Sequence, residues 1–383
     1  MAIDSSISGH GRIAATAKIP DMISIFKPTK LFRGRDHGSR SSRDKTPGKE
    51  AQIVSLDFSD GGEYLLTSES DNSMQIYDVI KGKHHKTCLS QKYGVSNAIF
   101  SHTTQNSGPC IIHSSTKLNH TIRYLSTHDN TYLRYFEGHE KNVTCLSLHP
   151  GQDNFLSCSE DDTVRVWDAG TKNPCGKLFL NGAYLAAWDP SGNVFAVASP
   201  TAQSVLLYDF RNFDRAPFST FDMLPHSSEA GIPGSITKGW NKLEFSNDGK
   251  SILLGTTGTG HILLDAFDGH LKAILHRGRG GVKRLGAGDH NPEHLDHHSP
   301  EFSYPSTGDS CFSSDGRFVL SGTRRENVLV WDTLSKATDG KILRPANELE
   351  YKGDSALIAF NPKYNMFATG DKEVVFWVPD RDQ

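Results

Sequence analysis

Apolar residues in this chain come in runs of four to six, separated by polar and turn-forming residues. The pattern is most regular in GHEKNVTCLSLHPGQDNFLSCSEDDTVRVWD, residues 138–168, which opens with Gly-His and closes with Trp-Asp. The runs are rich in Val, Leu, Phe and Cys and are too short for helices. This segment therefore predicts three short β-strands joined by turns.

The motif that closes this segment, Val-Trp-Asp, recurs in related forms along the whole chain. Its aromatic or leucine position falls at Tyr77, Leu125, Trp167, Tyr208, Leu264, Trp331 and Trp377. The intervals are 48, 42, 41, 56, 67 and 46 residues. A period of about 40–45 residues with this ending is typical of a four-stranded propeller blade. Seven copies predict an all-β, seven-bladed propeller.

A second marker repeats in phase with the first: an apolar strand followed by a polar or proline-containing turn. Its copies are LDFSDGG (56–62), SLHPGQD (147–153), AWDPSGN (187–193), EFSNDGK (244–250), CFSSDGR (311–317) and AFNPKYN (359–365). We interpret them as hairpins between the first and second strands of six repeats. The remaining repeat, near Ala98–His113, has a longer and less regular turn.

The last repeat stops after its third strand, at Trp377, with six residues left. A blade without its outer strand would expose an edge. We expect Lys30–Phe32 to supply that strand, so that both chain ends close the ring. The propeller is predicted to span 23–379, between disordered tails at 1–22 and 380–383. Stretches rich in Gly, Pro, Ser and His, at 35–50, 223–238 and 276–309, are predicted to be mobile loops.

Composition narrows the class of protein. The 383 residues carry a net charge of −3 and a pI near 6.6, which gives no general reason to bind nucleic acid. The six cysteines include no CxxC pair and suit a reducing compartment. No apolar run approaches the length of a membrane helix, and the start MAIDSSISGH has no features of a secretion signal. A cytosolic or nuclear protein is expected.

Four residues of the third repeat are of the right types for a buried hydrogen-bond chain: His139, Ser157, Asp161 and Trp167. Trp donates only, Ser donates and accepts, His relays and Asp accepts. Although the set contains Ser, His and Asp, it belongs to the repeat and is interpreted as structural. No other pair of residues forms a catalytic constellation, so no catalytic residue is predicted.

Three other motifs have plain interpretations. The histidines around His290, His294 and His298 suggest adventitious zinc binding at most, because Pro292 and neighbouring glycines disfavour a helix; no metal site is predicted. The glycines of RGRGG, 277–281, lack the order of a phosphate loop, and no cofactor is predicted. The basic stretch 33–49 is either a solvated loop or a contact for an acidic or phosphorylated partner.

The repeats resemble a WD-repeat β-propeller over residues 23–379. A narrower resemblance rests on KYGV (92–95), HTIRYLSTHDNTYLRYFEGH (120–139), LYDFRNFDRAPFSTF (207–221), LEFSNDGK (243–250), LLDAFDG (263–269) and FNPKYNMFATGDKEVVFWVPD (360–380). Together these are similar to the nuclear WD-repeat subunit shared by COMPASS-type histone methyltransferases and by RNA 3′-end-processing or phosphatase complexes. The resemblance fails in the long insertions and the extended N-terminus, which suggests a lineage variant, with a fungal source expected.

The resemblance implies a non-catalytic nuclear scaffold. It implies binding to a segment of the methyltransferase subunit, coupling of histone H3 lysine methylation to transcribing RNA polymerase II and its tail, and a second role in transcription termination. It implies neither sequence-specific nucleic-acid binding nor a membrane. An alternative is a substrate receptor of a cullin-type ubiquitin ligase, because Tyr208-Asp209-Phe210-Arg211 resembles the ending of such receptors.

One face of the propeller is the candidate surface for partners. Loops that lead into the inner strands, and loops between second and third strands, emerge on the same face. The aromatic, basic and amide residues predicted there are Tyr93, Lys117, Asn119, Lys141, Tyr184, Trp240, Arg324 and Arg325. Aromatic and basic residues are common anchors for peptides, so an extended, partly acidic partner segment is predicted. Trp240 has an alternative role, packing beneath the 223–238 loop.

Overall fold

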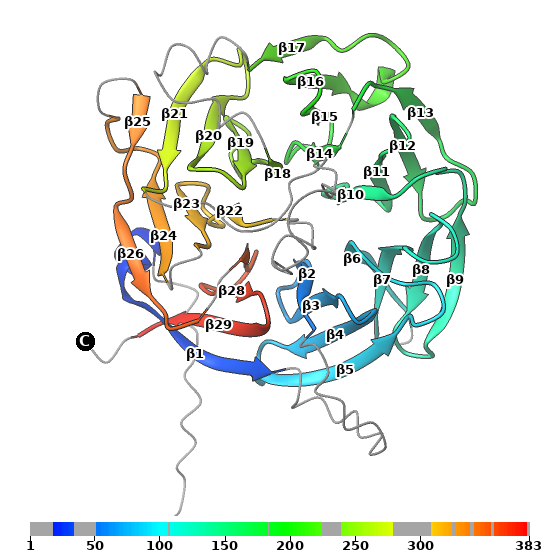
Figure 1. The fold of residues 1–383 in the computed structure, drawn as a ribbon, viewed down its shortest axis with the longest axis horizontal. Coiled ribbons are helices and arrows are strands. Elements are labelled where there is room, and N and C mark those ends of the chain that lie inside the picture. The colour runs from blue at the N-terminus through cyan, green and yellow to red at the C-terminus, as the bar shows by residue number, and fades with distance from the viewer. Residues whose placement is uncertain are drawn as a thin grey trace, which may run out of the picture.

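The computed structural model describes residues 18–33, 51–105, 108–182, 184–223, 239–278, 308–323, 327–337, 341–353 and 356–380. Their strands form seven sheets arranged as blades around a central axis (Figure 1). The predicted all-β, seven-bladed propeller is confirmed. The helices of the described residues are three-residue 3-10 turns: η1 (Ile19–Asp21), η2 (Ile23–Ile25) and η4 (Phe210–Asn212).

Each blade runs from an inner strand at the axis to an outer strand at the rim. The inner strands are β2 (Ile53–Phe58), β6 (Ala98–Gln105), β10 (Val143–Leu148), β14 (Leu185–Trp188), β18 (Trp240–Phe245), β22 (Ser310–Phe312) and β27 (Leu357–Phe360). The second strands are β3 (Tyr64–Glu69), β7 (Gly108–Ser114), β11 (Asn154–Ser159), β15 (Val194–Ser199), β19 (Ser251–Thr256), β23 (Phe318–Ser321) and β28 (Phe367–Gly370).

The third strands contain the recurring sequence motif. They are β4 (Ser73–Asp78), β8 (Ile122–Ser126), β12 (Thr163–Asp168), β16 (Ser204–Asp209), β20 (Gly260–Asp265), β24 (Asn327–Asp332) and β29 (Glu373–Pro379). The outer strands are β5 (Lys83–Leu89), β9 (Thr131–Phe136), β13 (Gly176–Phe179), β17 (Ser219–Asp222), β21 (Leu271–His276), β26 (Asn347–Glu350) and β1 (Phe26–Arg33). In the second blade, the irregular turn predicted from the sequence corresponds to a break in the β6–β7 register between Phe100 and Thr104.

The N-terminal strand closes the ring, as predicted. β1 pairs antiparallel with β29, with Phe32 opposite Val374, and the two strands lie side by side in blue and red (Figure 1). Two ion pairs join the strands and their ends, Lys27 Nζ–Asp380 Oδ2 and Arg33 Nε–Glu373 Oε1, each at 2.7 Å. The seventh blade is therefore completed by main-chain hydrogen bonds between the two ends of the chain.

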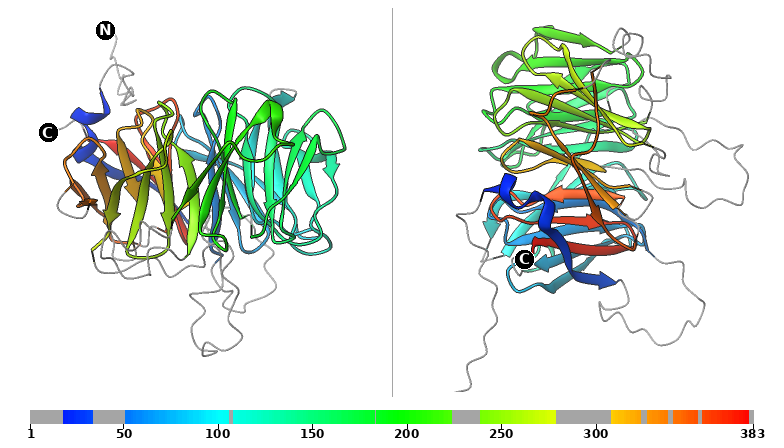
Figure 2. Two further views of the ribbon diagram at one scale, coloured as in Figure 1. Left: turned by 90° about the horizontal axis from the view of Figure 1, so that it is seen from above. Right: turned by 90° about the vertical axis from the view of Figure 1, so that its left-hand side faces the viewer.

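The packed part of the chain begins earlier than the predicted boundary at residue 23. Ile19 and Met22 are buried and belong to the same apolar cluster as Phe26 and Leu349. The 3-10 turns η1 and η2 thus lie against the sixth and seventh blades ahead of β1 (Figure 2). The predicted tail over 1–22 is wrong for residues 19–22, because apolar side chains at these positions complete the core between the last two blades.

The fifth blade has an additional strand that the sequence did not predict. β25 (Ile342–Leu343) lies between the third and outer strands of the sixth repeat, yet it pairs parallel with β21 of the fifth blade. Leu343 is buried together with Leu275 of β21. A segment of one blade therefore covers the outer edge of its neighbour, which protects that edge from other chains.

Adjacent blades are also joined through their hairpin turns. Asn361 of the seventh blade donates from Nδ2 to the carbonyl of Gly62 in the first blade, at 2.8 Å. Gly62 has a φ of +69°, and a Cβ there would clash with the Asn361 side chain. His149 of the third blade makes the corresponding contact with the Gly192 carbonyl of the fourth, at 3.0 Å. Glycine is required at such turns both by backbone conformation and by the closeness of the next blade.

The core consists of apolar layers between neighbouring blades. One such layer contains Phe136, Phe155 and Trp167, with Phe155 and Trp167 stacked at a centroid distance of 6.2 Å. In the part of the chain that the structure describes, no helix is long and apolar enough to cross a membrane. The predicted loop 35–50 lies outside the described residues, as do 224–238 and 279–307 of the other two predicted loops.

Candidate peptide-binding face

The candidate face is the side of the disc that carries the loops into the inner strands and the loops between second and third strands. Because neighbouring strands of a blade are antiparallel, these two sets of loops emerge together (Figure 2). Tyr93 lies in the β5–β6 loop, Lys117 and Asn119 lie in the β7–β8 loop, and Lys141 lies in the β9–β10 loop. Tyr184 lies in the β13–β14 loop, so five of the predicted residues lie on loops of this face.

Tyr93, Lys117 and Asn119 are brought together in the second blade. The main-chain N–H of Lys117 donates to the carbonyl of Tyr93 at 2.9 Å, and Lys117 Nζ donates to the carbonyl of Gln91 at 2.8 Å. Asn119 Oδ1 accepts hydrogen bonds from Arg123 Nη1 and Nη2, at 3.2 and 3.3 Å. These loops therefore meet around Arg123, a residue that the sequence analysis did not select.

Arg123 projects from β8 into a group of tyrosines. Its guanidinium carbon lies 3.7 Å from the ring centroid of Tyr93, 5.5 Å from that of Tyr135 and 6.0 Å from that of Tyr132. Such contacts between a cation and aromatic faces are attractive. The residue is 2% exposed, and burial lowers the pKa of Arg123 below its usual range. We refer to Tyr93, Lys117, Asn119, Arg123, Tyr132 and Tyr135 as the blade-two cluster.

The positive charge of Arg123 has no carboxylate beside it among the described residues. Its hydrogen-bond acceptors there are the hydroxyl of Ser115, the amide of Asn119 and the carbonyl of Thr121, and Nε has no partner. A buried cation is normally paired. At the edge of the cluster Lys117 and Asn119 are exposed, and Leu118 and Tyr135 are 64% and 39% exposed. The surface thus combines apolar and aromatic area with unneutralised positive charge.

The sequence did contain a signal for Arg123. The strand TIRYLS (121–126) aligns with TVRVWD (163–168), so Arg123 matches Arg165. Arg165 is also buried, and its Nη2 donates to the carbonyl of Gly138 at 2.6 Å. An arginine in the middle of an otherwise buried strand could have been selected for that reason alone, since arginine is rarely buried without a partner.

Two predicted contact residues are enclosed. Trp240 has no exposed surface and packs in the cluster that contains Leu243, Ile262 and Leu271, so it is wrong as a surface anchor. Tyr184 is 8% exposed, and its carbonyl accepts a hydrogen bond from Thr144 Oγ1 at 2.8 Å, which joins the third and fourth blades. Trp240 begins an inner strand, where the apolar layer between blades encloses its ring, and Tyr184 immediately precedes the next inner strand back along the chain.

The other predicted residues of this face differ in their surroundings. Lys141 is exposed, and its carbonyl accepts from Ser159 Oγ at 3.1 Å, apart from the blade-two cluster. Arg324 and Arg325 lie outside the described residues. The structure therefore gathers three of the eight predicted residues into one site, around an arginine and two further tyrosines.

In the third blade, the four side chains predicted to share hydrogen bonds are in contact. Trp167 Nε1 donates to Ser157 Oγ at 2.8 Å, His139 Nε2 lies 2.6 Å from the same hydroxyl, and His139 Nδ1 lies 3.0 Å from Asp161 Oδ2. Burial lowers the pKa of His139 to about 4. Burial opposes ionisation of Asp161 too, but hydrogen bonds from Thr163, Glu140 and His139 hold the pKa of Asp161 at about 2. The set is enclosed, which fits a structural role.

In the sixth blade, an ion pair and its hydrogen bonds take the place of this hydrogen-bond chain. Within the described ranges Trp331 Nε1 has no hydrogen-bond partner, although Ser321 stands at the position of Ser157. The Ser321 hydroxyl instead lies 2.9 Å from both His261 Nε2 and Arg277 Nη2 of the fifth blade. Arg277 Nη2 also forms an ion pair with Asp309 Oδ2 at 2.9 Å. Sequence analysis placed Arg277 and Asp309 in a mobile loop, but burial and this ion pair fix both.

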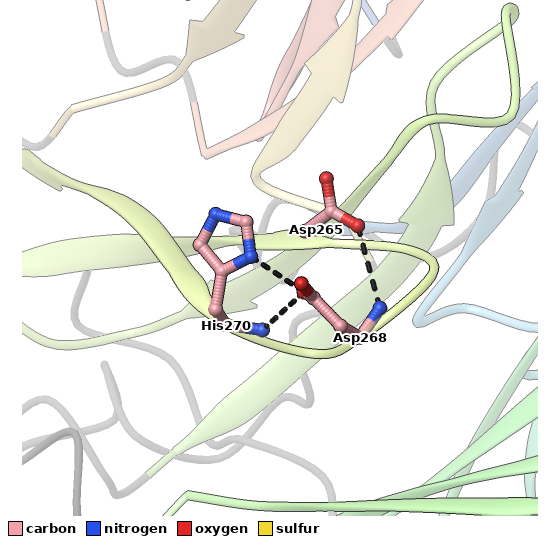
Figure 3. A group of neighbouring side chains, drawn as sticks. All are labelled: Asp265, Asp268 and His270. Carbon is pink, nitrogen blue, oxygen red and sulfur yellow. Dashed lines mark hydrogen bonds and ion pairs between the residues drawn. The ribbon is translucent and has the colours of Figure 1, made fainter.

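A group of possible metal ligands, Asp265, Asp268 and His270, lies in the turn between β20 and β21 (Figure 3). Asp265 Oδ1 accepts from the main-chain N–H groups of Phe267 and Asp268, and Asp268 Oδ1 accepts from that of His270. Asp265 Oδ2 also pairs with Lys272 Nζ at 2.9 Å. These carboxylates therefore stabilise the turn, and a lysine already supplies the positive charge.

Residue Arg211, on which the alternative ligase-receptor function depends, lies in η4 and is exposed. Its main-chain N–H donates to Asp209 Oδ1 at 2.9 Å, which caps the short turn. The local structure of Asp209-Phe210-Arg211 is thus explained by capping, and it does not point to a partner.

Comparison with known proteins shows similarity over nearly the full chain. Residues 41–78 and 130–168 match the family described as WD domain, G-beta repeat. WD repeat-containing protein 82 of Drosophila melanogaster is 36% identical over 365 residues, covering 95% of this chain and 98% of that protein. COMPASS component SWD2 of Saccharomyces cerevisiae is 36% identical over 361 residues, with 94% and 99% covered. Set1 complex component swd2 of Schizosaccharomyces pombe is 30% identical, with 93% and 98% covered.

Proposed function

This chain belongs to the WD-repeat family that includes WD repeat-containing protein 82 and COMPASS component SWD2, and on that premise we propose that it is a non-catalytic scaffold subunit of a COMPASS-type histone H3 lysine methyltransferase complex. A propeller by itself is compatible with many functions. The observation that carries the proposal is the extent of the similarity, which runs almost from end to end of both chains.

The proposal extends to the biology that the family resemblance implies. The protein works in the nucleus, where it links the methyltransferase to RNA polymerase II transcription and contacts the polymerase tail. A second pool serves a cleavage and polyadenylation or termination complex, with 3′-end-processing or phosphatase subunits as partners. The motifs at 120–139 and 360–380 support this part of the proposal, because they carry the narrower resemblance.

The blade-two cluster is the proposed binding surface for an extended, partly acidic segment of the methyltransferase subunit. Exposed Leu118 and Tyr135 offer apolar area, while Lys117 and the unpaired charge of Arg123 favour an acidic side chain. Tyrosine and arginine are frequent among the residues that dominate binding energy. A carboxylate placed over the cluster would neutralise charge that the fold leaves uncompensated.

The test of the scaffold function is affinity purification of the tagged full chain from its own cells, followed by identification of its partners. We expect a SET-domain methyltransferase and its complex subunits to co-purify, and the eluate to methylate histone H3 lysine. Recovery of a cullin adaptor without any methyltransferase, or of no stable partner, would overturn the proposal.

The binding surface is tested separately with a Lys117→Glu/Tyr135→Ala double variant. Its matched control is Lys172→Glu, which makes the same charge change in the β12–β13 turn on the opposite face. We expect recovery of the methyltransferase to fall at least about tenfold for the double variant, equivalent to about 1.4 kcal/mol. All proteins are first compared by thermal melting. Equal recovery from the double variant and the control would rule out this cluster as the binding surface.

A further inference from the structure

Cys145 and Cys158 lie directly opposite each other in the third blade, as Cα partners of the antiparallel strands β10 and β11. Side chains of opposed residues point to the same face of a sheet. The Cα atoms of such pairs are about 4.5–5.5 Å apart, which falls within the range of about 4.4–6.8 Å found in disulfides. Both side chains pack in one apolar cluster with Leu156 and Ala186. A disulfide could therefore form with little movement of the main chain.

The two thiols are in contact but differ in their access to solvent. Cys158 donates a hydrogen bond to the Cys145 sulfur, and Cys145 Sγ in turn donates to the carbonyl of Ala186 at 3.5 Å. Cys145 is partly exposed on the inner strand, which borders the central axis of the ring, whereas Cys158 has no exposed surface. An incoming small molecule would thus reach Cys145 first and find Cys158 directly behind it.

The electrostatic surroundings also distinguish the two thiols. The hydrogen bond from Cys158, aided by the positive charge of Lys242 on β18, lowers the pKa of the Cys145 thiol. Burial raises the pKa of the Cys158 thiol. An accessible thiol of lowered pKa next to a second cysteine is the usual arrangement of a redox-sensitive pair.

We propose that Cys145 and Cys158 form a reversible disulfide when the protein meets a peroxide. The Cys145 thiolate attacks one peroxide oxygen, the O–O bond breaks, and water and a sulfenic acid on Cys145 result. The Cys158 sulfur then attacks the Cys145 sulfur, the S–O bond breaks, and a second water leaves. Overall the two thiols lose two electrons and two protons to the peroxide. A dithiol reductant reverses the reaction by exchange.

The other cysteines make a contrasting set. Cys88, Cys110 and Cys311 are buried, and Cys175 is exposed but stands alone. Burial raises the pKa of the Cys175 thiol, so the more exposed residue is the weaker nucleophile at neutral pH. Cys145 has a second thiol directly opposite it whereas Cys175 has none among the described residues, so the geometry assigns peroxide reactivity to Cys145.

The experiment uses the full chain with Cys175→Ser, so that the exposed thiol cannot form intermolecular disulfides. The protein is treated with hydrogen peroxide, unfolded in the presence of an alkylating reagent and analysed by mass spectrometry. We expect the loss of two hydrogen atoms, two fewer alkylated thiols, and one linked peptide pair containing Cys145 and Cys158. Dithiothreitol should restore both thiols. If both cysteines remain fully alkylated after peroxide treatment, the proposal is wrong.

Two further variants separate the proposed reaction from general oxidation. In Cys158→Ser, which keeps a donor beside the Cys145 sulfur, Cys145 should stop at the sulfenic acid and be labelled by dimedone. In the control Cys110→Ala, which removes another fully buried cysteine, the disulfide should form as before. Dimedone labelling of Cys145 to the same extent in the Cys175→Ser protein and in Cys158→Ser would show that Cys158 does not react, and would overturn the proposal. If Cys158→Ser does not fold, the linked peptide decides the question.

Discussion

Arg277 Nη2 lies 2.9 Å from Asp309 Oδ2, and the side chains of both residues are fully enclosed. Asp309 also accepts a hydrogen bond from Asn241 of β18, and Arg277 Nε donates to His261 Nε2 at 3.0 Å. The ion pair joins the two chain segments on either side of residues 279–307. The fifth and sixth blades are therefore held together by charge, beside Ser321, which stands at the position of Ser157 in the third blade.

Removing one partner of this ion pair should be costly. We expect Arg277→Met to lower the free energy of unfolding by about 3–5 kcal/mol, because Asp309 is left as a buried, uncompensated charge. The double variant Arg277→Met/Asp309→Leu should recover much of that loss, since it removes both charges. Urea denaturation of wild type, Arg277→Met, Asp309→Leu and the double variant measures both effects. A double variant as unstable as the sum of the two single variants would contradict this account.

The contribution of the Trp167 hydrogen bond to stability can be measured by comparison with Trp331. Trp167 Nε1 bonds to Ser157, whereas Trp331 Nε1 has no partner in the described structure, and both rings are fully buried. Replacement by Phe removes the indole N–H and similar volume in both cases. We therefore expect Trp167→Phe to be more destabilising than Trp331→Phe by about 1 kcal/mol. Chemical denaturation gives the comparison; equal losses would mean that the bond contributes no net stability.

The stability of the third blade should depend on pH through His139. Burial lowers the pKa of His139 to about 4 in the folded state, against 6.5 for an ordinary histidine. Because the unfolded chain binds the proton more readily, this contribution is complete above pH 6.5 and is lost as pH falls toward 4. The shift corresponds to roughly 3 kcal/mol. Unfolding of wild type and of His139→Asn, measured between pH 7 and 4, should show the steeper decline in wild type.

Truncation from the N-terminus should reveal where the packed chain begins. Deletion of residues 1–17 leaves every described N-terminal contact in place and should not change the melting temperature. Deletion of residues 1–22 also removes buried Ile19 and Met22, and should cost roughly 3 kcal/mol or more. Deletion through Phe32 removes most of β1 and should be the most severe. Equal melting temperatures for the first two truncations would show that η1 does not support the fold.

The repeats were predictable because each blade restates the same local pattern. Residues 56–62 were predicted to link the first and second strands of a repeat, and they join β2 to β3. The other hairpins follow likewise from short apolar runs beside polar or proline-containing turns. The pairing of β1 with β29 was also predictable, since a repeat that lacks one strand requires another segment to supply it. Both predictions rest on the spacing of the repeats and on the need to pair exposed strand edges, and both can be made from a single sequence.

Other features depend on contacts between residues far apart in the sequence, which the local sequence pattern does not indicate. β25 is two residues long and pairs with the preceding blade, so nothing in its own sequence distinguishes it from a loop. Arg277 was placed in a mobile loop because glycines follow it, whereas its role is set by Asp309, 32 positions later. Trp240 was interpreted as a candidate surface anchor because it lies where a loop leads into an inner strand, but the apolar layer between two blades encloses it.

The pairing of β1 with β29 has a consequence for how the protein is made. β1 is the first strand of the propeller to be synthesised and its partner β29 is the last, so β1 has no partner strand until β29 has been made. Blades one to six can form in order meanwhile, from neighbouring segments. A chain that stops before β29 leaves both β1 and β28 with unpaired edges. Premature termination thus produces a nearly complete protein that chaperones and proteases can recognise by the unpaired edges of β1 and β28.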